Sequence, residues 1–195
     1  MAGVSFSGGA VSVTISPTDN MVHGTQYSHY LRDDIAKPAP CYYERLLSEA
    51  TNKVVIWDPY FHAPDTAIFR GLKNAIEVYV LSSKSKPLKD IYLDALIAET
   101  PNHLIPGVKS HCTFNFGFID TCKYGKELWN THDRFLIVDD KYYLVGASVA
   151  HHLASHDSTG ICRLRFRVDK QIVQNAFDKC WTVCVNDLMY KTKTL

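Results

Sequence analysis

The chain has 195 residues, of which 46% are hydrophobic and 21% are charged, and its formal net charge is +1. This composition excludes a disordered chain, and so small a charge excludes binding to a polyanion through bulk charge. No apolar run reaches the roughly 18–20 residues that a membrane span needs, and the N-terminus lacks the basic-then-apolar order of a signal peptide. We therefore expect a globular protein of the cytoplasm with no transmembrane segment.

The first 40 residues differ in pattern from the rest. Residues 1–16 alternate apolar and small polar side chains, which predicts one or two strands. Residues 17–40 are rich in polar residues, Gly and Pro, and are predicted to form a loop or a wrapping arm. We expect two parts: an N-terminal strand and arm over residues 1–40, and an α/β domain over residues 41–195.

Helical and strand patterns alternate from residue 41 onward. Helices are predicted over about 41–50, 64–74, 86–99 and 169–188, and strands over 53–57, 76–81, 112–118, 135–138, 142–145 and 161–168. The first of these strands, Lys53-Val54-Val55-Ile56-Trp57, is broken by Asp58-Pro59 and is typical of a buried central strand. The alternation predicts an α/β fold, a sheet with helices on both faces and a hairpin in its second half.

The six cysteines carry no functional signal. Cys180 and Cys184 are four residues apart in a helical pattern, and Cys112 and Cys162 fall in strand-like runs. No CxxC pair occurs, so we favour reduced thiols over a disulfide or zinc framework.

One stretch, from Thr131 to Ser148, carries residues suited to phosphate chemistry. His132 and Arg134 are two residues apart and would share one face of a strand. An imidazole can attack phosphorus or transfer a proton near neutral pH, and a guanidinium can grip two phosphate oxygens. Asp139 is either the carboxylate that fixes the imidazole tautomer or a residue of the hairpin turn. Gly146 and Ser148 would complete an oxyanion pocket through close backbone approach and a hydroxyl donor.

This stretch resembles the HxKxxxxDxxxxxxGSxN motif of the phospholipase D superfamily. His132, Asp139 and Gly146 match the motif, whereas Arg134 replaces the Lys, Ala147 stands at the Ser position with Ser148 one place later, and Val149 replaces the Asn. The pattern is similar to the divergent phospholipase D-like domain found C-terminal to MIT modules. The resemblance implies a mixed sheet flanked by helices, a phosphodiesterase reaction without metal or other cofactor, and His132 as nucleophile or general acid.

Active members of this superfamily bring two such motifs together, and this sequence holds one. The resemblance therefore implies a homodimer that pairs two copies of His132 across a two-fold axis. His151, His152 and His156 fit a mobile loop better than a metal site, because no carboxylate partner has suitable spacing.

Two further features bear on the substrate. Arg163, Arg165 and Arg167 are predicted to alternate on one strand face, where they would either track a polyanion backbone or remain solvated. The segment Trp57-Asp58-Pro59-Tyr60-Phe61 offers aromatic side chains for base stacking near the end of a strand, although Trp57 and Phe61 suit the core better.

We interpret the sequence as a phosphodiesterase, with a nuclease favoured over a lipase. The alternative is a degenerate module that binds nucleic acid, anionic lipid or a protein partner without turnover.

Overall fold

The computed structural model describes residues 3–7, 10–14, 26–30, 39–84, 89–105, 112–120, 124, 134–146 and 159–195. Its helices are α1 (Ala39–Ser48), the 3-10 helices η1 (Ala63–Gly71) and η2 (Thr100–Asn102), α2 (Lys89–Glu99) and α5 (Arg167–Asn186). Its strands are β1 (Gly3–Ser7), β2 (Ala10–Thr14), β3 (Gln26–Tyr30), β4 (Lys53–Trp57), β5 (Glu77–Lys84), β6 (Thr113–Asp120), β7 (Arg134–Val138), β8 (Lys141–Val145), β9 (Thr159–Leu164) and β10 (Tyr190–Thr194). The predicted order of strands and helices is thus confirmed from α1 to α5.

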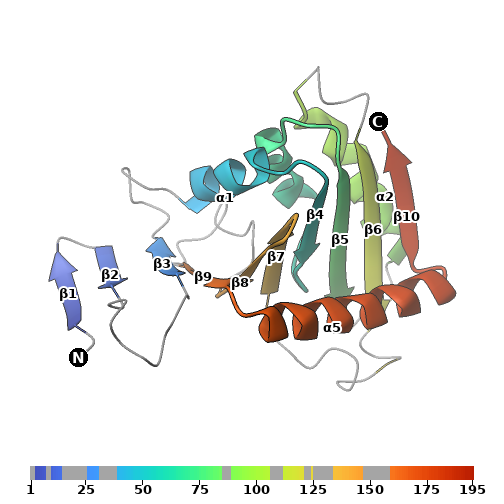
Figure 1. Cartoon of the computed structure of the whole chain (residues 1–195). Helices are drawn as coiled ribbons and strands as arrows, with labels where there is room; N and C mark the ends of the chain where they lie inside the picture. Colours follow the sequence, from blue (N-terminus) through green and yellow to red (C-terminus); the bar gives the residue numbers. More distant parts are fainter. Residues whose placement is uncertain are drawn as a thin grey trace.

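Eight of these strands form one mixed sheet in the order β10-β6-β5-β4-β7-β8-β9-β3 (Figure 1). The pairs β4–β5 and β5–β6 are parallel, and the remaining neighbours are antiparallel. β7 and β8 form the predicted hairpin through Asp139 and Asp140. β1 and β2 pair with each other in a separate two-stranded sheet.

Helices cover both faces of the large sheet, as the alternating pattern predicted. Val54 and Ile56 of β4 face the core shared with α1, η1 and α2, whereas Val55 and Trp57 face the core shared with α5. In Figure 1, α5 crosses the near side of the sheet and α2 lies behind it. β4 is therefore buried on both faces, which explains its uninterrupted apolar run.

Trp57 and Phe61 belong to the core, because they are only 4% and 0% exposed. The four described cysteines, Cys112, Cys162, Cys180 and Cys184, are free thiols. The core prediction for Trp57 and Phe61 is confirmed. Among the described helices, none combines the length and apolar character needed to cross a bilayer.

The boundary between β9 and α5 differs from the prediction. β9 ends at Leu164 and α5 begins at Arg167, so the predicted strand over 161–168 is too long. The apolar residues that extended the predicted strand, Phe166 and Val168, are 52% and 68% exposed, so burial does not hold them in the sheet, and Val173, Phe177, Cys180 and Cys184 form the buried stripe of α5. Ile172 and Leu188 lie outside this buried stripe, since they are 61% and 74% exposed.

Two edge strands of the large sheet also differ from the prediction. β3 lies within the predicted arm and adds to the sheet by pairing with β9. β10 was not predicted, because the sequence Tyr-Lys-Thr-Lys-Thr carries no apolar alternation. An edge strand that is largely exposed to solvent buries few side chains, so apolar residues are not required at alternate positions.

Candidate phosphate site at the carboxyl edge of the sheet

The parallel strands β4, β5 and β6 end at one edge of the sheet, which we call the carboxyl edge. β7 is antiparallel to β4, with Phe135 opposite Trp57, so Arg134 begins β7 at this edge. β8 returns beside β7, with Val145 opposite Arg134, and Gly146 follows it. Ligands of α/β sheets commonly bind outside the carboxyl ends of the strands, so a ligand site is expected at this edge.

Arg134 is held at the carboxyl edge by three neighbours. Its Nη1 donates to the Gly146 carbonyl oxygen at 3.2 Å, and its Nε lies 3.6 Å from Oδ1 of Asp58. Its guanidinium carbon lies 5.2 Å from the centroid of the Tyr60 ring. The side chain is 14% exposed, so the cation is largely enclosed but still reaches the surface. Gly146 thus acts through its carbonyl, as an acceptor that orients Arg134.

Asp58 is the carboxylate of this site, and its side chain is fully buried. Its Oδ1 accepts a hydrogen bond from the Tyr60 amide at 2.9 Å, and its own amide donates to the Leu81 carbonyl at 2.9 Å. A buried charge needs a partner, and Arg134 supplies the opposite charge. Asp58 therefore ties the end of β4 to the start of β7 through charge.

The segment that follows Asp58 is fixed by further hydrogen bonds. The Pro59 carbonyl accepts from Ser82 Oγ at 3.1 Å and from the Ser83 amide at 3.4 Å. The Tyr92 hydroxyl donates to the Phe61 carbonyl. Burial raises the pKa of Tyr92 far above its usual value, so this hydroxyl stays a donor. Tyr60, in contrast, is 42% exposed although its backbone is fixed.

Asp139 lies at the other edge of the sheet, in the β7–β8 turn, where its φ is 52°. Its Oδ1 accepts from the Asn52 and Lys53 amides at 2.9 and 3.0 Å, and its Oδ2 accepts from the amide and hydroxyl of Thr51, each at 3.0 Å. Burial raises the pKa of Asp139, but the hydrogen bonds outweigh this effect and hold its pKa below the usual value. Of the two roles considered for Asp139, its contacts are those of the turn residue, and we leave it out of the proposed reaction.

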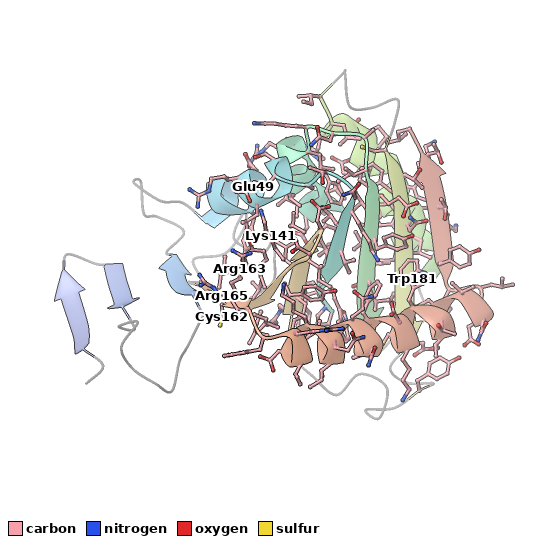
Figure 2. The ribbon with its side chains drawn as sticks, viewed as in Figure 1. Glu49, Lys141, Cys162, Arg163, Arg165 and Trp181 are labelled. Carbon is pink, nitrogen blue, oxygen red and sulfur yellow. The ribbon has the colours of Figure 1, made fainter. Side chains whose placement is uncertain are left out.

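The three arginines do not share one strand face, contrary to the prediction. Arg163 is in β9 opposite Tyr143, Arg165 follows the strand, and Arg167 begins α5. Because β9 starts at the carboxyl edge, these residues lie progressively farther from Arg134 along the sheet. Figure 2 shows Lys141, Arg163 and Arg165 in succession from α1 toward the start of α5.

Some predicted site residues lie outside the described part of the chain. They are His132, Ser148 and the histidine run His151, His152 and His156. In the sequence, His132 stands two residues before Arg134 and Ser148 two residues after Gly146, so both flank the carboxyl-edge residues along the chain. Within the described ranges, no group of three or more His, Cys, Asp or Glu side chains is arranged to hold a metal ion.

Asp58 was not predicted as a site residue from the sequence, and Tyr60 was considered only as one of several aromatic side chains suited to base stacking. A signal was present: a carboxylate directly follows the most apolar strand, at the end where an α/β sheet places its ligands. The preference for the core is correct for Trp57 and Phe61, whereas the side chain of Tyr60 is 42% exposed.

Comparisons with known proteins show the fold. No family model and no curated protein matches the sequence. Among solved structures, the chain is similar to NucT from Helicobacter pylori, with 13% identity and a TM-score of 0.50 over 82% of this chain and 98% of NucT. It is also similar to Nuc from Salmonella typhimurium, a phospholipase D family member, with 9% identity and a TM-score of 0.48 over 81% of this chain and 95% of Nuc.

A further similarity is to TrmBL2, an archaeal chromatin protein with a novel mode of DNA binding. The identity is 12% and the TM-score 0.45, over 88% of this chain and 55% of TrmBL2, so the chain spans about half the length of that protein. The chain therefore shares with NucT an α/β fold, a mixed sheet with helices on both faces.

Proposed function

We propose that this protein is a phosphodiesterase that cleaves nucleic acid through a phosphohistidine intermediate. The observation that carries the proposal is the guanidinium of Arg134, fixed at the carboxyl edge by Asp58, Gly146 and Tyr60. A guanidinium in this position can bind two non-bridging oxygens of a phosphodiester and offset the charge that develops on them. The fold it shares with NucT supports the same reading.

The proposed reaction has two steps. The His132 imidazole attacks phosphorus, a P–N bond forms, and the P–O bond to the leaving group breaks while a second imidazole protonates the departing oxygen. The second imidazole then takes a proton from a water molecule, the water oxygen attacks the phosphorus of the phosphohistidine, and the P–N bond breaks. Arg134 holds the phosphoryl oxygens in both steps, and Ser148 is proposed as a further donor to them. The scheme requires no metal ion.

The second imidazole is proposed to come from a second copy of the chain. The sequence supplies one motif, so a two-fold dimer would bring two copies of His132 to one phosphate. Sedimentation at micromolar concentration should therefore give a dimer, and specific activity should fall on dilution below the dissociation constant. A monomer with constant specific activity would contradict the paired-histidine arrangement.

A binding module without turnover is the second candidate, and one observation favours it. The charge of Arg134 is already opposed by Asp58, and one of its donors is used by Gly146, which weakens its grip on a phosphate. The sequence adds that Ala147 and Val149 stand where the superfamily motif has Ser and Asn. Such a module would still bind a phosphate-bearing polymer.

Comparing turnover with affinity separates the two candidates. We would incubate single-stranded DNA and RNA oligonucleotides with the protein in EDTA, and measure cleavage and affinity for the wild type and the His132→Ala variant. For an enzyme, His132→Ala should abolish cleavage and change affinity by no more than a few fold, because the imidazole acts mainly in the transition state. Cleavage that EDTA abolishes and magnesium restores would contradict the phosphohistidine scheme. Affinity without any cleavage would establish the binding module.

A further inference from the structure

Tyr60 is an exposed aromatic side chain on a fixed backbone beside a cation. Its residue is 42% exposed, although it lies between a fully buried aspartate two residues before it and a fully buried phenylalanine directly after it. An apolar ring at such a position contributes less to folding than its buried neighbours do. The exposed ring of Tyr60 is therefore available to contact a ligand.

The backbone under Tyr60 is held by short-range and long-range hydrogen bonds. The Tyr60 amide donates to Asp58 Oδ1 at 2.9 Å, and the Pro59 carbonyl before it is bound by Ser82 and Ser83 of β5. The Phe61 amide donates to the Asp58 carbonyl at 3.3 Å. Fixing the platform before binding lowers the entropy that a ligand must give up on it.

The neighbouring cation defines what such a platform can bind. The guanidinium carbon of Arg134 lies 5.2 Å from the Tyr60 ring centroid, so an anionic group at Arg134 is within a few ångströms of the ring. In a nucleic acid strand, a base is separated from its own phosphate by one sugar. An aromatic surface beside a phosphate-binding cation therefore matches one nucleotide, with its phosphate at Arg134 and its base on Tyr60.

We propose that Tyr60 is a base-stacking subsite and that the substrate is single-stranded nucleic acid. The inference rests on the proposed function in placing a phosphate at Arg134. Both faces of a base in a duplex are covered by neighbouring bases, so only an unpaired base can stack on the ring. A phospholipid headgroup has a phosphate but no aromatic base, so Tyr60 gives it no comparable contact.

The test compares intact oligonucleotides with a backbone that lacks bases. We would measure binding of a single-stranded oligonucleotide and of one of equal length made of abasic tetrahydrofuran residues, which carries the same number of phosphates. Tyr60→Ala should weaken binding of the intact strand by about 5- to 150-fold, the range that stacking of one base is worth. It should change binding of the abasic strand by less than about twofold, and Tyr60→Phe should restore the affinity for the intact strand.

Tyr190 offers a matched control, because it is a second exposed tyrosine, at 37%, on the edge strand β10. Tyr190→Ala should leave both affinities unchanged. If Tyr60→Ala lowers the melting temperature enough to prevent measurement, Tyr60→Leu keeps the apolar contact and removes the aromatic ring. Equal losses for intact and abasic strands, or no loss for either, would overturn the subsite. So would Tyr60-dependent binding to anionic vesicles that compete with the intact strand.

This binding assay stays informative if the proposed reaction fails. Base-dependent affinity without cleavage would reject the enzyme and keep the subsite. Cleavage that is insensitive to Tyr60 would keep the enzyme and reject the subsite.

Discussion

The carboxylate of Asp58, fully buried, lies 3.6 Å from Nε of Arg134, so the cation proposed to bind phosphate already has a fixed counter-charge. Asp58→Asn removes this charge but keeps an oxygen that can accept the Tyr60 amide hydrogen bond. We expect the variant to bind single-stranded oligonucleotides several-fold more tightly, because Arg134 is no longer neutralised. We expect kcat to fall at the same time, because the guanidinium loses the group that orients it. Titrations over a range of salt, together with steady-state kinetics, measure both effects.

Asp94→Asn is the control for that experiment. Asp94 is 64% exposed and pairs with Lys191 of β10, so its removal alters the net charge by the same amount away from Arg134. An equal gain in affinity for the two variants would mean that Asp58 acts only through total charge. Weaker binding by Asp58→Asn, with an unchanged melting temperature, would contradict the proposed neutralisation.

Arg134→Lys tests whether the guanidinium itself matters, since it restores the residue of the superfamily motif. An ammonium group is a point charge and cannot hold two oxygens through parallel hydrogen bonds. We expect the variant to lose activity by about 10- to 150-fold, the equivalent of charged hydrogen bonds worth about 1.5–3 kcal/mol. Cleavage rates with saturating oligonucleotide measure this loss. An unchanged or higher cleavage rate would show that the site does not depend on the two parallel hydrogen bonds of the guanidinium.

Asp139 should affect stability and leave the reaction intact. Its carboxylate accepts four hydrogen bonds that join the β7–β8 turn to the start of β4, so Asp139→Ala should cost about 1–3 kcal/mol of unfolding free energy. Asp139→Asn should cost less, because Asn tolerates the positive φ and keeps one acceptor oxygen. Urea denaturation measures the loss. A folded Asp139→Asn variant without activity would return this residue to the reaction.

The pH dependence of stability provides a second measurement on Asp139. The pKa of Asp139 is held below its ordinary value of 3.8, so its contribution is complete above that value and is lost as pH falls through the lower folded pKa. The difference in stability between the wild type and Asp139→Asn should be constant near neutral pH and shrink below about pH 4. A difference that grows with acidity would have the wrong sign.

The positions of Arg165 and Arg167 suggest that their effect on nucleic-acid binding depends on the length of the nucleic acid. Arg165 and Arg167 are exposed and lie toward the edge of the sheet opposite Arg134, so a short ligand bound at Arg134 cannot reach them. We expect the double Ala variant to bind a dinucleotide as the wild type does. If a longer strand follows these side chains, its log–log salt slope should decrease by about one for each arginine–phosphate ion pair that the substitutions remove. Equal slopes for long strands would assign both arginines to a solvated surface.

Hydrophobic periodicity predicted most of the sheet, because burial imposes it directly. The run from Val54 to Trp57 in β4 is apolar since helices cover both faces of the strand, and the strand predicted over 112–118 buries Phe114, Phe116 and Phe118 in one core. The pattern fails where burial is partial. β10 has one edge and one face in solvent, and the start of α5 continues the alternation of β9 without being a strand.

The site was harder to predict than the fold, because its contacts join residues far apart in the chain. The motif located Arg134 and Gly146, whereas Asp58 became visible only once β4 and β7 were paired. The motif spacing also suggested that Asp139 acts together with His132. Asp139 instead follows the five-residue strand β7, which begins with Arg134 at the carboxyl edge and ends at the opposite edge. Spacing along a strand therefore fixes which edge a residue reaches, and strand pairing fixes what it meets there.

The two buried thiols of α5 allow the detachment of this helix from the sheet to be measured. Cys180 and Cys184 are 1% and 0% exposed, and the Cys184 thiol donates to the Phe118 carbonyl of β6 at 3.3 Å. Burial raises the pKa of Cys180 to about 11 and that of Cys184 to about 12, so neither forms a reactive thiolate at neutral pH while the helix is docked. Alkylation of these two cysteines must therefore wait for α5 to leave the sheet, and the labelling rate measures the free energy of that local detachment without any engineered label site.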